Sequence, residues 1–244
     1  MKALVLCAGF GQRLGELTAN CPKPLLSLGQ ETIVEHILRQ LVRASITDVY
    51  INLHYLAPQF PAHLGDGERF GLRLHYLHER APKGTAGTPR DLAAEIANDA
   101  LLVHYGDIVT NHDLSELAHA HRDLTAEATI LVHQRPGSNS YAYFADDGQH
   151  IERFVERPAT SPDPTRPSWA FSGVCVLCAG LLRRLSPAPV LDLPRDVFPG
   201  VAKARRLAGQ PLRGYRWAID SPERLAMARR ALAPGSPYER ERSR

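Results

Sequence analysis

Apolar residues along the first half of the chain alternate between two patterns. Short continuous apolar runs, typical of strands buried on both faces of a parallel sheet, occupy residues 2–8, 48–53, 72–77 and 101–105. Helices are expected between and after them, at residues 31–44, 58–64, 88–96 and 114–122. Strands that alternate with helices through short connections predict an α/β fold with a doubly wound, mostly parallel sheet.

The pattern changes after residue 122. Strands are expected at 128–133, 141–145, 150–155 and 173–178, and turn sequences at 135–137 and 146–148 predict hairpins between the first three. A last strand is expected at 212–217 and a last helix at 222–232, with Ser221 as its cap. We expect a single domain over residues 1–233, with a small inserted antiparallel part at about 128–178. The proline-rich segment 158–167 is expected to be an irregular loop, and the tail 234–244 to be disordered.

Composition and charge narrow the class of protein. The 44% of hydrophobic and 23% of charged residues are ordinary globular values, and no apolar run approaches the roughly 20 residues that span a bilayer. The net charge of +3 and the absence of a concentrated basic patch argue against a nucleic-acid partner. No secretion signal precedes the first strand, so we expect a cytoplasmic protein with reduced thiols. Cys175 and Cys178 lie on an expected strand, where residues three apart face opposite sides, so we assign them to packing.

A glycine-rich loop follows the first strand. Gly9, Gly11 and Gly15 leave backbone N–H groups open to a phosphate, at the strand edge where open α/β sheets bind ligands. Neither the dinucleotide fingerprint nor the P-loop matches, because the third glycine is one residue late and no Gly-Lys-Ser/Thr follows. Arg13 lies inside this loop, and Lys23 stands between two prolines that are expected to hold the backbone extended. Two such cations suit a triphosphate.

At this point the chain resembles the sugar nucleotidyltransferases in their short single-domain form, the pyrophosphorylases that make nucleoside-diphosphate sugars. The resemblance covers residues 1 to about 231. It is carried by matching motifs in the family's order, at 9–14, 22–25, 35–36, 84–87, 105–107, 155–158, 172–174 and 220–223. It implies a Rossmann-like nucleotidyltransferase fold whose segment 128–178 binds the sugar.

The resemblance also implies the reaction and the residues that serve it. A sugar 1-phosphate attacks the α-phosphorus of a nucleoside triphosphate, and pyrophosphate leaves. Asp107 is the implied ligand for a catalytic Mg²⁺, and Arg13 and Lys23 are the implied cations on the triphosphate, which makes these three the expected catalytic residues. The expected nucleotide-binding set is Ala8, Gly9, Gly11, Gln12, Arg13, Lys23, Glu79, Gly84 and Thr85. No histidine is expected to act, because a sugar phosphate is already ionised at neutral pH.

The chain departs from the family pattern at several of these positions. The usual Glu-Lys-Pro reads Glu156-Arg157-Pro158, which puts a guanidinium on the sugar phosphate, and the expected sugar-phosphate set is Ala142, Glu156, Arg157 and Gly173. The slot that commonly holds a second metal-binding aspartate is Ala218 here. Asp220 either reaches the metal from a shifted turn or caps the final helix.

Glu79 falls in the slot whose residue reads the base. A carboxylate only accepts hydrogen bonds, so it suits guanine, which offers two adjacent N–H groups, better than uracil. GTP is therefore favoured, with UTP next. Two alternatives stay open: a catalytically silent, nucleotide-binding regulatory subunit, and a cytidylyltransferase acting on a non-sugar phosphate. The sequence leaves the sugar and the oligomeric state open, a homo-oligomer included.

Overall fold

The computed structural model describes residues 1–244 apart from 136–137, 139, 158–162, 164 and 237–244. The chain forms two compact units. We call them the N-terminal unit (2–82, 104–114 and 213 onward) and the central unit (Met1, 83–103 and 115–212). The predicted turn at 135–137, most of the loop at 158–167 and most of the tail lie outside the described residues.

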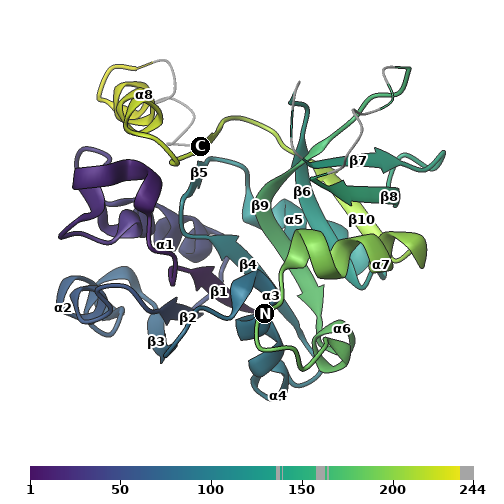
Figure 1. Ribbon diagram of the computed structural model, residues 1–244, viewed down its shortest axis with the longest axis horizontal. Coiled ribbons are helices and arrows are strands. Elements are labelled where there is room, and N and C mark those ends of the chain that lie inside the picture. Colours follow the sequence, from purple (N-terminus) through teal and green to yellow (C-terminus); the bar gives the residue numbers. More distant parts are fainter. Residues whose placement is uncertain (136–137, 139, 158–162, 164, 237–244) are drawn as a thin grey trace. The chain divides into compact units, whose positions relative to one another are not determined.

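The N-terminal unit is built on parallel strands. Its elements are β1 (Lys2–Leu6), η1 (Gln12–Thr18), η2 (Lys23–Leu25), α1 (Ile33–Arg43), β2 (Asp48–Leu53), α2 (Gln59–Leu64), η3 (Glu68–Phe70), β3 (Arg73–His78), β5 (Ile108–Thr110), β11 (Arg216–Ala218) and α8 (Pro222–Leu232). β1 pairs with β2 and β2 with β3, both in parallel and without a register shift, and the three strands lie side by side in Figure 1. β5 and β11 form a separate antiparallel ribbon.

Helix α1 shows why these residues fold as they do. A capping box begins it: the Thr32 side chain accepts the N–H of Glu35, and the Glu35 carboxylate accepts the N–H of Thr32. One face, formed by Ile33, Ile37 and Leu41 among others, is fully buried, as are the core positions of β1. The 3₁₀ turns η1 and η2 lie between β1 and α1, where no helix was expected.

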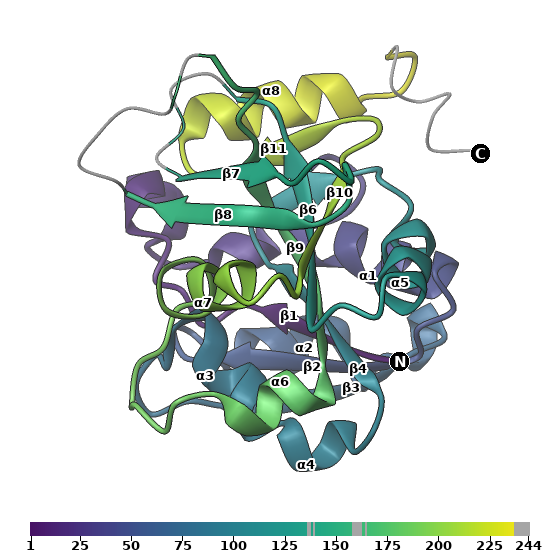
Figure 2. The same cartoon turned by 90° about the vertical axis from the view of Figure 1, so that its right-hand side faces the viewer.

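The central unit contains α3 (Gly84–Asp91), α4 (Ala93–Ile96), α5 (Leu114–Asp123), β6 (Ala128–His133), β7 (Ser140–Phe144), β8 (Ile151–Glu156), β9 (Ala170–Cys178), α6 (Ala179–Arg184), η4 (Leu193–Val197), α7 (Phe198–Lys203) and β10 (Leu207–Pro211). β10 pairs with β6 in parallel, and β6 pairs with β9 antiparallel. The first four residues of β4 (Ala100–Tyr105) belong to this unit and its last two to the N-terminal unit. Figure 2 shows β7 and β8 as a two-stranded ribbon with α7 beside β8, where Phe154 and Phe198 meet edge to face at 5.4 Å.

The α/β fold with a mostly parallel sheet and extra antiparallel strands is confirmed, while several local predictions were wrong. No hairpin joins 128–133 to 141–145, because β6 is buried between β10 and β9 and β7 pairs with β8 instead. Of the strand expected at 212–217, residues 216–217 lie in β11, while residues 212–215 form the connection between β10 and β11. The helix expected at 88–96 begins at Gly84 and is interrupted at Leu92.

Candidate active site

The glycine loop of the N-terminal unit leaves the end of β1 and turns at once. Gly11 has φ of +68°, a left-handed conformation that a side chain disfavours, and it precedes the 3₁₀ helix η1. Buried Leu14 anchors the loop, and the Thr18 hydroxyl donates to the Gly11 carbonyl at 3.1 Å. Ala8 is buried, Gln12 and Arg13 are exposed, and a Cβ at Gly9 would meet no atom within 4 Å. The loop therefore presents backbone at Gly9 to a ligand.

Lys23 lies against this loop. A Cβ built on Gly11 would come within 3.3 Å of the Lys23 Cβ, so the close approach depends on the glycine. Lys23 begins the 3₁₀ turn η2 and is not extended as expected; Pro22, which precedes the turn, and Leu26, which follows it, have extended backbone. Its side chain is 13% exposed, and its Nζ lies 2.9 Å from Oδ2 of Asp107. The stiff segment thus directs the lysine to the predicted metal ligand.

Asp107 follows the carboxyl end of β4. Gly106 donates its N–H to the Leu6 carbonyl at 3.0 Å, which fixes this end of β4 beside the end of β1. A Cβ at Gly106 would lie 2.6 Å from that carbonyl oxygen, so glycine is required here. The Gly-Asp motif therefore brings the carboxylate to the glycine loop, at a sheet edge of the kind that binds ligands in such folds.

Asp220 reaches the same place from the other end of the chain. Ala218 on β11 pairs with Ile108 on β5, and the Ile219 N–H donates to the Asp107 carbonyl at 2.8 Å. The Asp220 carboxylate forms ion pairs with Arg13 at 3.7 Å and Arg224 at 3.1 Å. Of the two alternatives for Asp220, the helix cap is wrong, because the Ser221 side chain accepts the N–H of Arg224 and caps α8. We call Arg13, Lys23, Asp107 and Asp220 the carboxylate cluster.

The carboxylate cluster fits a magnesium ion. Mg²⁺ prefers hard oxygen ligands and is usually held by one or two carboxylates together with substrate phosphates. Asp107 and Asp220 supply such a pair, each with a quarter of its side chain exposed. Among the described residues, no group of three or more His, Cys, Asp or Glu side chains is arranged to hold a metal. A metal here would thus depend on phosphate oxygens for its remaining ligands.

Glu79 is buried at the end of β3, and its carboxylate is fixed. The Asn52 amide donates to Oε1 of Glu79 at 2.8 Å, while the Asn52 carbonyl oxygen accepts the N–H of Cys7 at 2.7 Å. The His54 ring nitrogen Nδ1 lies 2.8 Å from the Glu79 carbonyl oxygen. Asn52 therefore ties the predicted base-reading residue to the strand from which the glycine loop departs.

Gly84 and Thr85 lie in the central unit, at the start of α3. The Thr85 hydroxyl donates to Asp192 Oδ2 at 3.0 Å and accepts the N–H of Leu193 at 2.8 Å. Gly84 has φ of +76°, and a Cβ there would lie 2.3 Å from the Leu191 carbonyl oxygen. Within this unit both residues hold the segment that leads into η4.

The predicted sugar-phosphate residues are spread over three strands of the central unit. Ala142 on β7 is fully buried, and its N–H donates to the Trp169 carbonyl at 2.7 Å. Gly173 lies within β9 with φ of +88°. Glu156 ends β8, and burial followed by the negative charge of Asp192 raises the pKa of its carboxyl. Arg157 comes next, 79% exposed and with φ of +47°, a conformation uncommon for residues other than glycine.

Two side chains in the N-terminal unit were missed at the sequence level. Arg224 pairs with Asp220 four positions earlier, a spacing that places the two side chains on one face where a helix begins. Asn52 was readable as the lone amide in the otherwise apolar end of a buried strand. Buried polar groups need hydrogen-bond partners, so an amide in such a run marks a specific contact.

Comparisons with known proteins show the family of the chain. The family model described as nucleotidyl transferase matches residues 2–193. The chain is 30% identical over 230 residues to the mannose-1-phosphate guanylyltransferase catalytic subunit beta of Xenopus tropicalis, covering 91% of this chain and 62% of that protein. It is 30% identical over 200 residues to the mannose-1-phosphate guanylyltransferase of Mycobacterium tuberculosis, covering 82% of this chain and 55% of that protein. The chain thus spans about three fifths of the length of these curated relatives.

A solved structure shares the whole fold. A putative glucose-1-phosphate thymidylyltransferase from Bacillus anthracis superposes with a TM-score of 0.84 at 21% identity, over 100% of this chain and 99% of that one. Within the described residues, every helix is too short or too polar to cross a membrane. The motif order, the sheet topology and the family match together establish that the chain belongs to the nucleotidyl transferase family of sugar nucleotidyltransferases.

Proposed function

We propose that this chain joins a nucleoside triphosphate to a sugar 1-phosphate, giving a nucleoside-diphosphate sugar and pyrophosphate, with GTP preferred to UTP. The observation that carries the proposal is the carboxylate cluster, in which two ion pairs, Lys23 with Asp107 and Arg13 with Asp220, join distant parts of the sequence to the glycine loop and the segment after it. The names of the relatives, mannose-1-phosphate guanylyltransferases, support GTP and mannose 1-phosphate as the first substrates to test.

The cluster suits phosphoryl chemistry because its work is charge neutralisation and alignment. Arg13 and Lys23 would bind triphosphate oxygens, while Asp107 and Asp220 would hold Mg²⁺, which neutralises charge on the phosphoryl and leaving-group oxygens when bound. An oxygen of the sugar phosphate forms the new bond to the α-phosphorus, and the bond to the departing pyrophosphate breaks. The attacking oxygen is already ionised, so no side chain has to remove a proton.

Arg157 is the proposed cation for the sugar phosphate. Its guanidinium offers a fork of donors that matches two phosphate oxygens, which a lysine would contact only as a point charge. Its left-handed backbone conformation holds an exposed cation at the end of β8. Such outliers persist when the surrounding structure enforces them, and they cluster at ligand sites. We further propose that residues 1–233 act as one catalytic domain whose segment 128–178 contacts the sugar.

The base preference rests on Glu79. Its carboxylate is held by Asn52, so it accepts hydrogen bonds from a fixed position. Guanine presents two adjacent N–H donors to such an acceptor and uracil only one. Replacing one carboxylate oxygen by an amide, as in Glu79→Gln, would set an N–H group against a guanine donor. We expect the preference for GTP to fall about tenfold or more, in line with the ~1–3 kcal/mol that a good bidentate contact contributes.

The test is pyrophosphate release measured with each of four nucleoside triphosphates against a panel of sugar 1-phosphates, in excess Mg²⁺. We expect the highest turnover with GTP and mannose 1-phosphate, with UTP next. Glu79→Gln should change the ranking of the triphosphates, whereas Glu68→Gln, an exposed acid on η3 of the same unit, should not. Release with no pair would overturn the proposed reaction, and an unchanged ranking in Glu79→Gln would remove Glu79 from the base site.

A further inference from the structure

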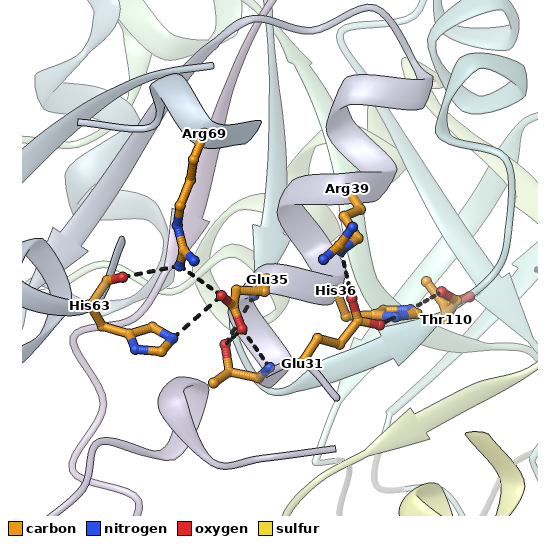
Figure 3. A network of polar contacts seen from close by, with 8 residues as sticks. Glu31, Glu35, His36, Arg39, His63, Arg69 and Thr110 are labelled. Atoms are coloured by element: carbon orange, nitrogen blue, oxygen red, sulfur yellow. Dashed lines mark hydrogen bonds and ion pairs between the residues drawn. The ribbon is translucent and has the colours of Figure 1, made fainter. Parts of the chain in front are cut away.

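A buried polar network joins helix α1 to the ribbon of β5 and β11 (Figure 3). His36 on α1 lies between two acceptors: its Nδ1 is 3.0 Å from Glu31 Oε1, and its Nε2 is 2.9 Å from the Thr110 carbonyl oxygen. Arg39 holds the other Glu31 oxygen at 2.8 Å. His36, Glu31 and Thr110 are each less than 9% exposed.

The hydrogen positions in this network follow from the chemistry of the acceptors. A carbonyl oxygen only accepts, so Nε2 of His36 must carry a proton and donate it to Thr110. Between Nδ1 and Glu31, one further proton is shared. Gln40, one turn after His36 on α1, donates its amide to the same Thr110 carbonyl at 2.5 Å. Two side chains of one helix are thus used to fix a single backbone carbonyl.

That carbonyl belongs to the ribbon that carries both aspartates. Thr110 ends β5, and its hydroxyl donates to the Tyr215 carbonyl at 2.7 Å, just before β11. At the opposite end of the ribbon, the Ile219 N–H binds the Asp107 carbonyl, and Asp220 follows. The ribbon has only three residues in each strand, so it has few hydrogen bonds of its own to set its position. Fixing the Thr110 carbonyl therefore helps to fix the positions of the Asp107 and Asp220 carboxylates.

We propose that His36, assisted by Gln40, is a positioning residue for the metal-binding carboxylates. It holds the Thr110 end of the ribbon against α1, and through the ribbon it sets the separation and orientation of Asp107 and Asp220. The proposal rests on the proposed function, because it assigns a role toward the Mg²⁺ that these carboxylates would hold. Groups that orient metal ligands from behind commonly account for about 10- to 100-fold in metal affinity or activity.

Two conservative variants separate this role from a general structural one. In His36→Gln the terminal amide lies where Nε2 was, so the bond to Thr110 is retained and the contact with Glu31 is lost. In His36→Asn the amide replaces Nδ1, so the contact with Glu31 is retained and the bond to Thr110 is lost. Positioning through Thr110 predicts that His36→Asn is the damaging change and that His36→Gln recovers most of the activity.

The first readout is the Mg²⁺ concentration that gives half-maximal pyrophosphate release. We expect it to rise about tenfold in His36→Asn and much less in His36→Gln. The matched control is His121→Gln. His121 is another buried histidine on a helix, and its Nδ1 lies 2.9 Å from the Thr129 hydroxyl on β6, a hydrogen bond that this variant removes. β6 carries no residue of the carboxylate cluster, so this variant should lose stability without changing the Mg²⁺ requirement.

The second readout needs no activity: hydrogen exchange at the Ile219 amide, which reports the bond to Asp107. We expect exchange about tenfold faster in His36→Asn than in wild type, and near wild type in His36→Gln. If His36→Asn does not fold, Gln40→Leu removes one donor to Thr110 and should move both readouts in the same direction by less.

Equal effects of the two His36 variants, or an unchanged Ile219 amide together with an unchanged Mg²⁺ requirement, would overturn the positioning role. Absence of pyrophosphate release in wild type would instead overturn the proposed function. The exchange measurement would still decide whether His36 holds the ribbon.

Discussion

The carboxylate cluster of the N-terminal unit and the 128–178 segment of the central unit are built in different ways. In the cluster, each charged side chain has an oppositely charged neighbour, Lys23 with Asp107 and Arg13 with Asp220. In the 128–178 segment, the side chain of the proposed phosphate-binding cation Arg157 is 79% exposed, and its Nε lies 3.6 Å from Oε1 of Glu156. The cluster is thus prearranged by its own charges, whereas the segment presents an open cation.

This difference indicates how each region depends on its residues. Side chains that are aligned before the reaction contribute to turnover, because misplacement by about 1 Å can cost on the order of 100-fold in rate. An exposed cation on a short ribbon contributes mainly to binding the group it contacts. The two regions should therefore be separable by kinetics: changes in the cluster should lower kcat, and changes in the segment should raise KM for the sugar phosphate.

The largest effect is expected from Asp107→Asn. The amide keeps the shape and can still accept from Lys23 Nζ, but it removes the charge that would hold the metal. Turnover should fall by about 100- to 1,000-fold, the range seen when one preorganised electrostatic contact is removed from a reaction centre. Pyrophosphate release measures the loss, and circular dichroism checks that the chain folds.

Asp48→Asn is the matched control for Asp107→Asn. Asp48 also forms an ion pair in the N-terminal unit, with Arg73 at 2.6 Å. That pair lies on the surface at the start of β2. This variant should keep its turnover. Full turnover in Asp107→Asn would show that the cluster does not carry the reaction.

A second comparison uses one buried histidine from each unit. Burial lowers the pKa of His104 in β4 and of His121 in α5 from 6.5 to about 4. Between pH 6.5 and about pH 4 each histidine is protonated in the unfolded chain but stays neutral in the folded chain. The free energy of unfolding is therefore at its full value above pH 6.5 and decreases as the pH falls toward 4. For fully buried His104 this loss amounts to about 3 kcal/mol, or roughly 100-fold in the unfolding equilibrium.

His104→Leu should remove that pH dependence. Urea unfolding at pH 7 and pH 4 would show the variant gaining about 3 kcal/mol relative to wild type at the lower pH, whatever its packing costs at pH 7. His121→Leu provides the same measurement in the central unit. If residues 1–233 unfold as one domain, both variants should act on a single transition. Two transitions, each sensitive to one histidine, would contradict the predicted single domain.

Much of the fold was predictable where local and global signals agree. Helix α1 combines a capping box at Thr32 and Glu35 with an apolar face, and α8 begins after Ser221 as expected. β10 was missed because Leu207–Pro211 contains glycine, glutamine and proline. It forms a strand by pairing in parallel with β6, and Gly209 leaves room for Phe144, since a Cβ there would lie 2.6 Å from the Phe144 ring. Helix α3 was misplaced because Gly84, Gly87 and Pro89 all disfavour a helix.

In the candidate site, too, the residues in short local motifs were predictable, and those that depend on pairing between distant segments were not. The glycine loop, Lys23 and the Gly-Asp motif were readable because each is a short motif whose chemistry is local. The sequence left Asp220 open between a metal ligand and a helix cap, because its contact with the cluster depends on pairing between β5 and β11, two three-residue strands with no periodic signal. His36 was expected to take no part in the reaction, and nothing in the sequence shows that its partner is a carbonyl on β5.

Arg157→Ala tests the 128–178 segment. Because the guanidinium is exposed, its loss should leave the fold unaffected. KM for the sugar 1-phosphate should rise about tenfold, which corresponds to one charge-assisted hydrogen bond of ~1.5 kcal/mol. KM for the nucleoside triphosphate should not change. Arg166→Ala is the control, because that arginine pairs with Glu152 on the same ribbon. Equal changes in both KM values for Arg157→Ala would contradict the division between the regions.

Ser221→Ala is expected to have the smallest effect and bears on Asp220. The Ser221 hydroxyl caps α8 by accepting the Arg224 N–H at 3.3 Å, and removing such a cap costs about 1 kcal/mol. If the cap and the proposed metal ligand are separate, the variant should unfold at slightly lower urea while its half-maximal Mg²⁺ concentration stays at the wild-type value. A shifted Mg²⁺ requirement would mean that the start of α8 and the Asp220 carboxylate act as one unit. The cluster would then depend on the helix terminus as well as on the β5–β11 ribbon.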